Sequence, residues 1–233
     1  MFAASLRKAR KSYRLGDVEV VALAELSLDI RAGRFTVLCG ASGSGKTTLL
    51  NLIGCIDRPD SGQVQVAGTA METLADDALS DFRARHIGFV FQHFNLLPMF
   101  TVYENVECPL ALAGVPRSER RPRIAALLEA VGLADRAGSR PAQLSGGQRQ
   151  RVAIARALVT DPSLVLADEP TANLDSRTGG AIIELMRGLQ RARGCSFVFS
   201  SHDPLLHAEA DDLVRLRDGR IEAVEQRDAL LPA

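Results

Sequence analysis

Apolar and polar positions alternate over much of the beginning of the chain. The stretches DVEVVALAEL (17–26) and LSLDIRAG (26–33) show this alternation, which predicts two short strands. A turn is expected at Ala32-Gly33, and the apolar run RFTVLCG (34–40) predicts a further strand. The chain therefore begins with a β-rich region.

A helical spacing of apolar residues follows Gly45. The run KTTLLNLIGCI (46–56) has this spacing and predicts a helix. The turn residues of DRPDSG (57–62) end the helix. Strand alternation then returns in GQVQVAG (62–68).

Helical patterns prevail in the middle of the chain, from about residue 74 to residue 137. LADDALSDFRARH (74–86) predicts one helix, and RSERRPRIAALLEAVGL (117–133) predicts another that Pro122 interrupts near its start. Between them lies an apolar and aromatic stretch, IGFVFQHFNLLPMFTVYENV (87–106).

Strand and helix patterns alternate again after Asp161-Pro162. The expected elements are a strand at 163–168, a helix at 176–194, a strand at 195–202, a helix at 203–210 and two strands within 212–221. Such βαβ order favours a mostly parallel sheet covered by helices. The helical middle of the chain would then be an insertion into this sheet domain.

Composition and charge narrow the possible functions. The 233 residues are 46% hydrophobic, which is ample for a packed core. Basic and acidic residues number 28 each, so the formal net charge is zero and no overall field favours nucleic acid or an anionic membrane surface. We therefore expect no nucleic-acid partner.

The cysteines and the apolar runs indicate where the protein works. The four cysteines form no CxxC pair, which suits thiols in a reducing compartment. No apolar run approaches the ~18 residues needed to span a bilayer, and the N-terminus lacks the apolar centre of a signal peptide. We expect a cytoplasmic protein, and any membrane span it works with belongs to another polypeptide.

The clearest chemical motif is a phosphate loop. GASGSGKTT fits the pattern G-x-x-x-x-G-K-[ST] between an apolar strand and a helix. It consists of Gly40, Ala41, Ser42, Gly43, Ser44, Gly45, Lys46, Thr47 and Thr48. The glycines let the backbone wrap phosphates, the lysine supplies a cation to their oxygens, and the Thr47 hydroxyl can ligate Mg²⁺. A merely flexible turn would not need this lysine, hydroxyl and spacing together.

Two acids end the apolar strand in SLVLADEP (163–170). Asp168 can bind the Mg²⁺ shell at the carboxyl edge of the sheet. Because side chains alternate along an extended chain, Glu169 should point elsewhere and be free to polarise an attacking water. Two solvated acids at a strand end are the simpler alternative, which the nearby phosphate loop disfavours.

Three further side chains have either a functional or a structural interpretation. His202 follows FVFSS and can reach a γ-phosphate, although a lone histidine is often only a structural hydrogen-bonding group. Gln92 follows IGFVF and could contact Mg²⁺ or the water through its amide oxygen, or merely cap a strand. Tyr13 offers a ring on which a base could stack, or a side chain for the core.

A second glycine loop, LSGGQ (144–148), carries no lysine. Ser145 is the expected N-cap of a helix that buries Val152, Ala155 and Leu158. The N–H groups around Gly146 and Gly147 would also form an anion site at the helix start. Capping and anion binding use the same groups, so both interpretations can hold.

Taken together, these motifs resemble the nucleotide-binding subunit of an ATP-binding cassette (ABC) transporter. The resemblance covers nearly the whole chain and rests on six ordered pieces: GASGSGKTT, FQHFNLLP, LSGGQ, LVLADEP, NLD (173–175) and SSHD. It implies an α/β fold with a P-loop NTPase core and a mostly parallel sheet, an N-terminal antiparallel β subdomain and an inserted α-helical signature subdomain. Residues 1–233 would form a single ABC ATP-binding domain, with 1–91 and 161–233 as the nucleotide-binding core with the β subdomain and 92–160 as the signature subdomain.

The same resemblance implies roles for single residues toward ATP and Mg²⁺. Residues 40–48 would be the Walker A site, with Asp168 as the Walker B acid and Glu169 as the catalytic carboxylate. Tyr13 would stack on adenine, Gln92 would be the Q-loop residue that senses Mg²⁺ and the permease, and His202 would be the switch histidine. The signature residues Ser145, Gly146, Gly147 and Gln148 would close over ATP bound by another copy, and Asp175 would belong to the D-loop that bridges the two.

The family pairs its cassettes head to tail and couples them to membrane permeases. The implied partners are therefore a second copy of this chain and a transmembrane permease, contacted near Gln92–Leu97, which would hold the protein at the inner face of the cell membrane. The wording of LLNLIGCIDRPDSG, FVFQHFNLLPMFTVYENV and ADEPTANLD is similar to the lipoprotein-releasing, macrolide-exporting and cell-division cassettes.

The sequence also allows other functions. Importer cassettes share much of this wording, and a regulatory cassette could bind ATP and signal through a permease. A soluble ABC ATPase acting on DNA or ribosomes is disfavoured, because the chain has no long coiled coil between the Walker A and signature motifs and only one Walker A loop. An unrelated phosphoryl transferase would have no role for LSGGQ.

Overall fold

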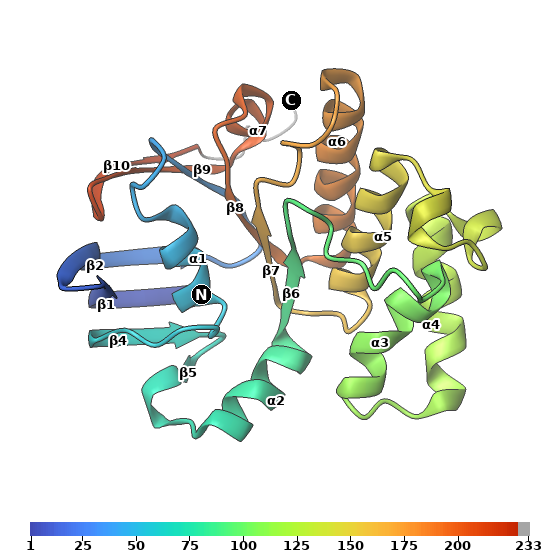
Figure 1. Ribbon diagram of the computed structural model, residues 1–233, viewed down its shortest axis with the longest axis horizontal. Coiled ribbons are helices and arrows are strands. Elements are labelled where there is room, and N and C mark those ends of the chain that lie inside the picture. The colour runs from blue at the N-terminus through green and yellow to red at the C-terminus, as the bar shows by residue number, and fades with distance from the viewer. Residues whose placement is uncertain (228–233) are drawn as a thin grey trace.

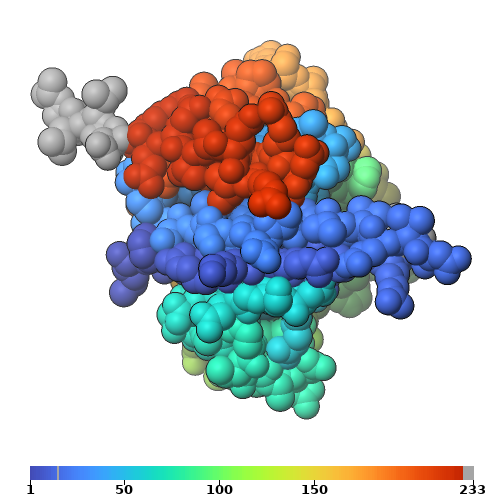
Figure 2. Space-filling model, turned by 90° about the vertical axis from the view of Figure 1, so that its left-hand side faces the viewer, coloured from blue at the N-terminus to red at the C-terminus, as the bar shows by residue number. Residues whose placement is uncertain are grey.

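The computed structural model describes residues 1–227, which form two β-sheets and the helices packed on them (Figure 1). A four-stranded antiparallel sheet has the order β2-β1-β4-β5. Its strands are β1 (Phe2–Leu15), β2 (Val18–Arg31), β4 (Ser61–Val66) and β5 (Thr69–Ala70). In the space-filling view, the first strands lie as a band between the C-terminal strands and the segment around residues 61–86 (Figure 2).

The central sheet has six strands in the order β10-β9-β3-β8-β7-β6. They are β3 (Phe35–Cys39), β6 (Ile87–Val90), β7 (Leu164–Asp168), β8 (Ser196–Ser200), β9 (Asp212–Arg217) and β10 (Arg220–Gln226). All neighbouring pairs are parallel except β9 and β10, which form an antiparallel hairpin. The predicted mostly parallel sheet is confirmed.

Seven α-helices and three short 3₁₀ turns complete the described residues. The helices are α1 (Lys46–Ile53), α2 (Asp76–His86), α3 (Val102–Leu112), α4 (Arg117–Ala130), α5 (Gly146–Leu158), α6 (Ser176–Arg193) and α7 (Pro204–Glu209). The 3₁₀ turns are Met71–Thr73, Ala134–Arg136 and Pro141–Gln143. Within residues 1–227, no helix has both the length and the apolar composition needed to cross a bilayer.

The central strands are buried on both faces, which divides the core into two layers. Alternate residues of β8 show the division: Phe197 and Phe199 pack among residues of α3 to α6, whereas Val198 packs with α1 and the N-terminal sheet. The same alternation separates Val37 from Leu38 in β3. A strand with apolar side chains on both faces reads as a continuous apolar run, as these segments do.

One strand, β2, replaces the two short strands that were expected over residues 17–33. The apparent break is a β-bulge: Lys11 pairs with Leu23 and Ala9 with Leu26, so β2 has one residue more than β1 in this interval. Glu25 has a φ of 55° there. The bulge shifts the alternation by one position, so Leu23 and Leu26 are both buried.

The expected interruption of the helix at Pro122 is also wrong. Helix α4 continues through Pro122, which lies in its second turn. A proline there leaves only the carbonyl of Ser118 in the first turn without its helical partner, and Ser118 is exposed to solvent.

Two of the longer elements, β1 and α3, have no counterpart among the expected segments. In β1, basic residues lie between the buried alanines and leucine, so the alternation of apolar and polar residues typical of a strand is hard to recognise. The second begins with a capping box in which Thr101 and Glu104 bond each other's backbone N–H groups. The T-x-x-E spacing at residues 101–104 was a usable sequence signal for this helix.

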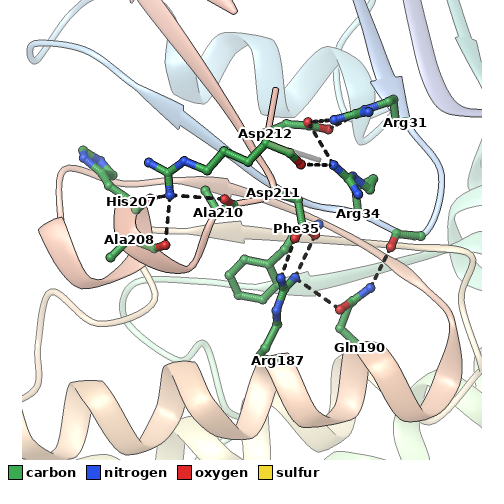
Figure 3. Close-up of polar contacts among 12 residues, drawn as sticks. Arg31, Arg34, Phe35, Arg187, Gln190, His207, Ala208, Ala210, Asp211 and Asp212 are labelled. Atoms are coloured by element: carbon green, nitrogen blue, oxygen red, sulfur yellow. Dashed lines mark hydrogen bonds and ion pairs between the residues drawn. The ribbon is translucent and has the colours of Figure 1, made fainter. Parts of the chain in front are cut away.

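A cluster of ion pairs joins α6 to the central sheet at the start of β9 (Figure 3). Arg187 of α6 donates to Asp211 at 2.8 Å, and Asp211 also accepts the Phe35 N–H at 2.8 Å. The side chains of Arg187 and Asp211 are each only 15% exposed. Asp212 beside it pairs with Arg31. The cluster fixes the starts of β3 and β9 relative to α6.

We expect the Asp211→Asn variant to lose about 2 kcal/mol of unfolding free energy at neutral pH, because Arg187 loses its partner in a mostly buried place. Burial alone would raise the pKa of Asp211, but bonds from Arg187 and the Phe35 N–H outweigh it and hold this pKa below its ordinary value. The stabilisation is therefore present above about pH 4 and lost as the pH falls through the lower folded-state pKa.

Urea unfolding at pH 7 and at acid pH measures both effects. The wild type and the variant should converge in stability as the pH falls. Asp161→Asn is the matched control, because Asp161 pairs with Arg193 but is 63% exposed, so its loss should cost less than about 0.5 kcal/mol. Equal losses in the two variants would contradict the role given to the buried pair.

Candidate functional site

A cleft of about 710 Å³ opens at the carboxyl ends of the central strands. It is lined by Tyr13, Val20, Val21, Ala22, Gly40, Ala41, Ser42, Gly43, Gly45, Lys46, Thr47, Thr48, Gln92, Asp168, Glu169, Ala172, Ser200 and His202. Residues from distant parts of the sequence therefore meet here. Among the predicted site residues, Ser44, Ser145, Gly146, Gly147, Gln148 and Asp175 are not part of this lining.

The phosphate loop joins β3 to α1 and is shaped by close backbone contacts. A Cβ on Gly40 would lie 2.2 Å from the Leu216 carbonyl oxygen, and one on Gly45 would lie 2.6 Å from the Ala22 carbonyl oxygen. Gly45 is also the N-cap of α1, has a φ of 102° and makes no side-chain cap. The first N–H groups of α1 consequently remain available to an anion.

Lys46 folds back over its own loop. Its Nζ donates to the Gly40 carbonyl at 2.8 Å and to the Ala41 carbonyl at 3.0 Å. These neutral acceptors leave the positive charge of the ammonium uncompensated, so phosphate oxygens at the loop would be stronger partners.

A hydroxyl and a carboxylate lie side by side at the end of the loop. Thr47 Oγ1 is 3.4 Å from Asp168 Oδ2, which joins the start of α1 to the end of β7. Burial raises the pKa of Asp168, and the negative charge of Glu169 raises it further. A divalent cation would relieve both effects, and this oxygen donor pair is of the kind that Mg²⁺ prefers. The loop and these ligands together fit a magnesium-bound nucleotide.

Glu169 turns away from Asp168, but not for the reason expected. The strand ends at Asp168, and Glu169 has a φ of 45°, so strand alternation does not determine its direction. Its backbone N–H donates to the Ser200 carbonyl at 2.8 Å. The carboxylate accepts from Ser201 Oγ at 3.3 Å, and its other oxygen lies 2.9 Å from Nδ1 of His202.

Gln92 and Tyr13 stand at the rim of the cleft. Gln92 follows β6 and is exposed, and its carbonyl accepts a 2.8 Å bond from the Asn173 side chain. Tyr13 is 38% exposed, so it lies outside the core, and its hydroxyl donates to Asp57 at 2.9 Å. Asn173, Ser201 and Asp57 are contacts that sequence reasoning missed, because they depend on which loops meet.

The LSGGQ segment forms the start of α5 as expected. Ser145 is the N-cap in a capping box with Gln148, and the helix buries Val152, Ala155 and Leu158. Asp175 likewise caps α6, accepting the Thr178 N–H at 3.0 Å. The structural interpretation of Ser145 is thus confirmed, whereas the capping role of Asp175 was not predicted. Neither residue lines the cleft of its own chain.

Comparison with known proteins decides the family. The ABC transporter family model matches residues 23–172, a range that includes the phosphate loop, the LSGGQ segment and the Asp168–Glu169 pair. The chain belongs to the ABC transporter family. Its cassette is similar at 51% identity over 209 residues to the lipoprotein-releasing system ATP-binding protein LolD of Chromohalobacter salexigens, covering 90% of this chain and 88% of that protein.

Two other comparisons concern a longer relative and a solved structure. It is 48% identical over 219 residues to the macrolide export ATP-binding/permease protein MacB of Syntrophobacter fumaroxidans, covering 93% of this chain but 31% of that longer protein. A dimeric post-hydrolysis structure of the ATP-binding cassette MJ0796, bound to ADP and Pi, matches with a TM-score of 0.88 and 41% identity. That match covers 97% of this chain and 100% of the other. The expected fold class is confirmed.

We expect Gly45→Ala to weaken Mg·ADP binding by the cassette more than tenfold, because the added Cβ would meet both Ala22 and Leu23 of β2. Gly43→Ala is the matched control. Gly43 also has a positive φ of 79°, but no heavy atom beyond its chain neighbours in the described residues lies within 4 Å of a Cβ there. Gly43→Ala should therefore lower the free energy of unfolding by only about 1 kcal/mol, through backbone strain.

Thermal unfolding and calorimetric titration with Mg·ADP distinguish the two variants. A Gly45 variant that binds as well as the Gly43 variant would show that contact with β2 does not shape the loop.

Proposed function

We propose that this chain is the ATP-hydrolysing cassette of an export-type ABC transporter, which pairs head to tail with a second copy on two Mg·ATP and drives a transmembrane permease. One observation carries the proposal: the cleft collects the phosphate loop and both acids, whereas the LSGGQ helix start lies outside it. A second copy facing the first could supply its LSGGQ segment to this cleft. The relatives named for lipoprotein release and macrolide export support an export role.

Mg·ATP would be held by residues that already face one another. The N–H groups at the start of α1 and the Lys46 ammonium would bind phosphate oxygens, in exchange for the carbonyl contacts that Lys46 now makes. Thr47 and Asp168 would provide oxygen ligands to Mg²⁺. The ion, when bound, neutralises negative charge on the phosphates that would otherwise repel a nucleophile.

Glu169 would act as the base toward an attacking water. Ser201 and His202 hold its two carboxylate oxygens, while the side chain is still 19% exposed toward the cleft. His202 itself is 78% exposed and could turn to donate to a γ-phosphate. Asp168 is committed to Thr47, so the two acids have separate tasks.

The LSGGQ segment would complete the site of the second copy. Gly146 and Gly147 are the first two residues of α5, so their N–H groups have no helical acceptor. A Cβ on Gly147 would lie only 2.6 Å from Thr178, which is bonded to Asp175. This close packing would keep the signature segment and the D-loop in one unit that approaches the partner's nucleotide.

The permease would contact the segment that begins at Gln92 and runs to Leu97. Leu97, Met99 and Phe100 follow one another closely and are 40%, 72% and 41% exposed, an unusual grouping of large apolar side chains. A neighbouring groove of about 490 Å³ is lined in part by Phe89, Phe91 and Leu112. This contact would hold the cytoplasmic cassette at the inner membrane face.

Two contacts would transmit motion between the permease and the nucleotide. Asn173 holds the Gln92 carbonyl from the D-loop side, and Arg156 of α5 bonds the carbonyls of Phe94 and Asn95. The permease-facing segment is thereby bonded to both elements that would meet the second copy.

We retain residues 92–160 as the proposed signature subdomain and 1–91 with 161–233 as the nucleotide-binding core.

We expect Glu169→Gln to lower kcat for ATP by roughly 10²-fold or more, because the amide cannot accept the proton from water. Mg·ATP binding should persist, so the variant should accumulate as a dimer with ATP but not with ADP. Steady-state phosphate release and size-exclusion chromatography measure the two effects. Unchanged hydrolysis would refute the role of Glu169, and a monomer at saturating ATP would contradict the paired cassette.

A further inference from the structure

Tyr13 is held by two charged residues, Lys11 and Asp57, to which the proposed function assigns no role. Its hydroxyl donates to Asp57 Oδ2 at 2.9 Å, and the other oxygen of Asp57 accepts from Lys11 Nζ at 2.7 Å. Lys11 also donates to the Arg58 carbonyl at 2.8 Å and lies 5.4 Å from the centroid of the Tyr13 ring. These three side chains form a connected group, which we call the Tyr13 clamp. Lys11 Nζ also lies 3.6 Å from Asp60, and the Tyr13 hydroxyl also interacts with the Thr48 side chain.

The Lys11 ammonium lies over one face of the Tyr13 ring. A flat ligand would therefore stack on the opposite face. Tyr13, Val20 and Val21 line the same cleft as the phosphate loop. The tyrosine hydroxyl gives its proton to Asp57 and also interacts with Thr48, so it has no proton to donate to a ligand.

The charge states of the clamp suit these bonds. Partial burial would raise the pKa of Asp57, but bonds from Lys11, the Arg58 N–H and Tyr13 outweigh it and keep this pKa below its ordinary value. Burial and the Asp57 carboxylate raise the pKa of the Tyr13 hydroxyl. At neutral pH the carboxylate therefore accepts and the phenol donates.

Asp57 is fixed to the helix that carries the phosphate loop. It follows α1 by a short turn, in which the N–H groups of Ile56 and Asp57 donate to the Asn51 carbonyl at 2.9 and 3.3 Å. Helix α1 itself begins at Lys46. The bond from Tyr13 to Asp57 therefore connects the tyrosine ring on β1 to the turn after the C-terminal end of α1. The phosphate loop lies at the other end of this helix.

We propose that Asp57, supported by Lys11, is a positioning residue that sets the place of the Tyr13 ring relative to the phosphate loop, so that a nucleobase and its phosphates are held at a fixed spacing. The inference rests on the proposed function, in which Tyr13 stacks on adenine. A preformed ring saves the cost of ordering a side chain on binding. The clamp therefore favours ligands that carry both a base and phosphates.

The alternative is that these bonds only stabilise the junction between β1 and the turn after α1. Ser12 provides a matched control for that role, because its N–H and hydroxyl donate to Asp60 of the same turn at 2.7 and 2.8 Å. Ser12 is not in the cleft lining or the clamp, and Ser12→Ala removes only the hydroxyl bond, so that Asp60 keeps its bond from the backbone N–H and its contact with Lys11. Loss of the hydroxyl bond should affect stability alone.

The test measures binding of two ligands to the full chain by calorimetry: Mg·ADP, and Mg·tripolyphosphate, which lacks a base. Tyr13→Phe and Asp57→Asn should each weaken Mg·ADP binding about three- to tenfold and leave Mg·tripolyphosphate binding within twofold. The double variant should bind Mg·ADP no worse than Tyr13→Phe alone, because without the hydroxyl the residue at position 57 can no longer act on the ring through this bond. Ser12→Ala should bind both ligands as the wild type does.

Three results would overturn the proposal. In the first, Tyr13→Phe and Asp57→Asn bind Mg·ADP as the wild type does, while Tyr13→Ala binds it weakly. This result would support stacking on Tyr13 and refute the clamp. Equal weakening of Mg·ADP and Mg·tripolyphosphate in Asp57→Asn would show that Asp57 acts through the phosphate loop as a whole. Wild-type affinity in Tyr13→Ala would refute the stacking role itself, and with it the clamp.

Discussion

Parallel pairing of β3, β8 and β7 is the constraint on which the site depends. In this register Leu38 pairs with Ser200, and Ser200 pairs with Asp168, so the three strands end at one level. Asp168 is the last residue of β7, and the phosphate loop, Glu169 and His202 come shortly after the ends of these strands. Since both faces of the strands are buried, a shift of register would move apolar side chains between two separate cores. The position of the charged groups is therefore determined by apolar packing beneath them.

At the same edge of the sheet, two adjacent acids have different hydrogen-bond partners. Asp168 ends its strand beside Thr47, whereas the left-handed backbone at Glu169 directs the next carboxylate to Ser201 and His202. Such a backbone conformation costs energy in a residue other than glycine and is maintained by its surroundings, here by the bond to the Ser200 carbonyl. The phosphate loop lies in the cleft, whereas the helix start at Ser145 lies outside it. In the proposed function each is half of a phosphate site, which would account for two glycine loops of which only one has a lysine.

Much of this could be predicted from the sequence, because local chemistry determined it. The βαβ order, the phosphate loop and the cap at Ser145 follow from short-range patterns of apolar, glycine and capping residues. The bulge at Glu25 could not be predicted, since it removes the alternation on which strand prediction relies. The direction of Glu169 was expected for the wrong reason, because it depends on a bond to a strand that is distant in sequence. Contacts such as Asp57 with Tyr13 and Asn173 with Gln92 join segments whose spacing carries no local signal.

The central claim is that each chain holds two half-sites that are completed by another copy, and a mixing experiment tests it most directly. Lys46→Ala should remove the phosphate-binding half, and Ser145→Arg should remove the closing half while sparing Mg·ATP binding by the same chain. Either variant alone should be inactive. An equal mixture contains heterodimers with one intact composite site, so ATP hydrolysis should reappear, up to about a quarter of the wild-type rate for random pairing. No recovery in a mixture that does form heterodimers, or normal hydrolysis by the Ser145→Arg chain alone, would contradict the account.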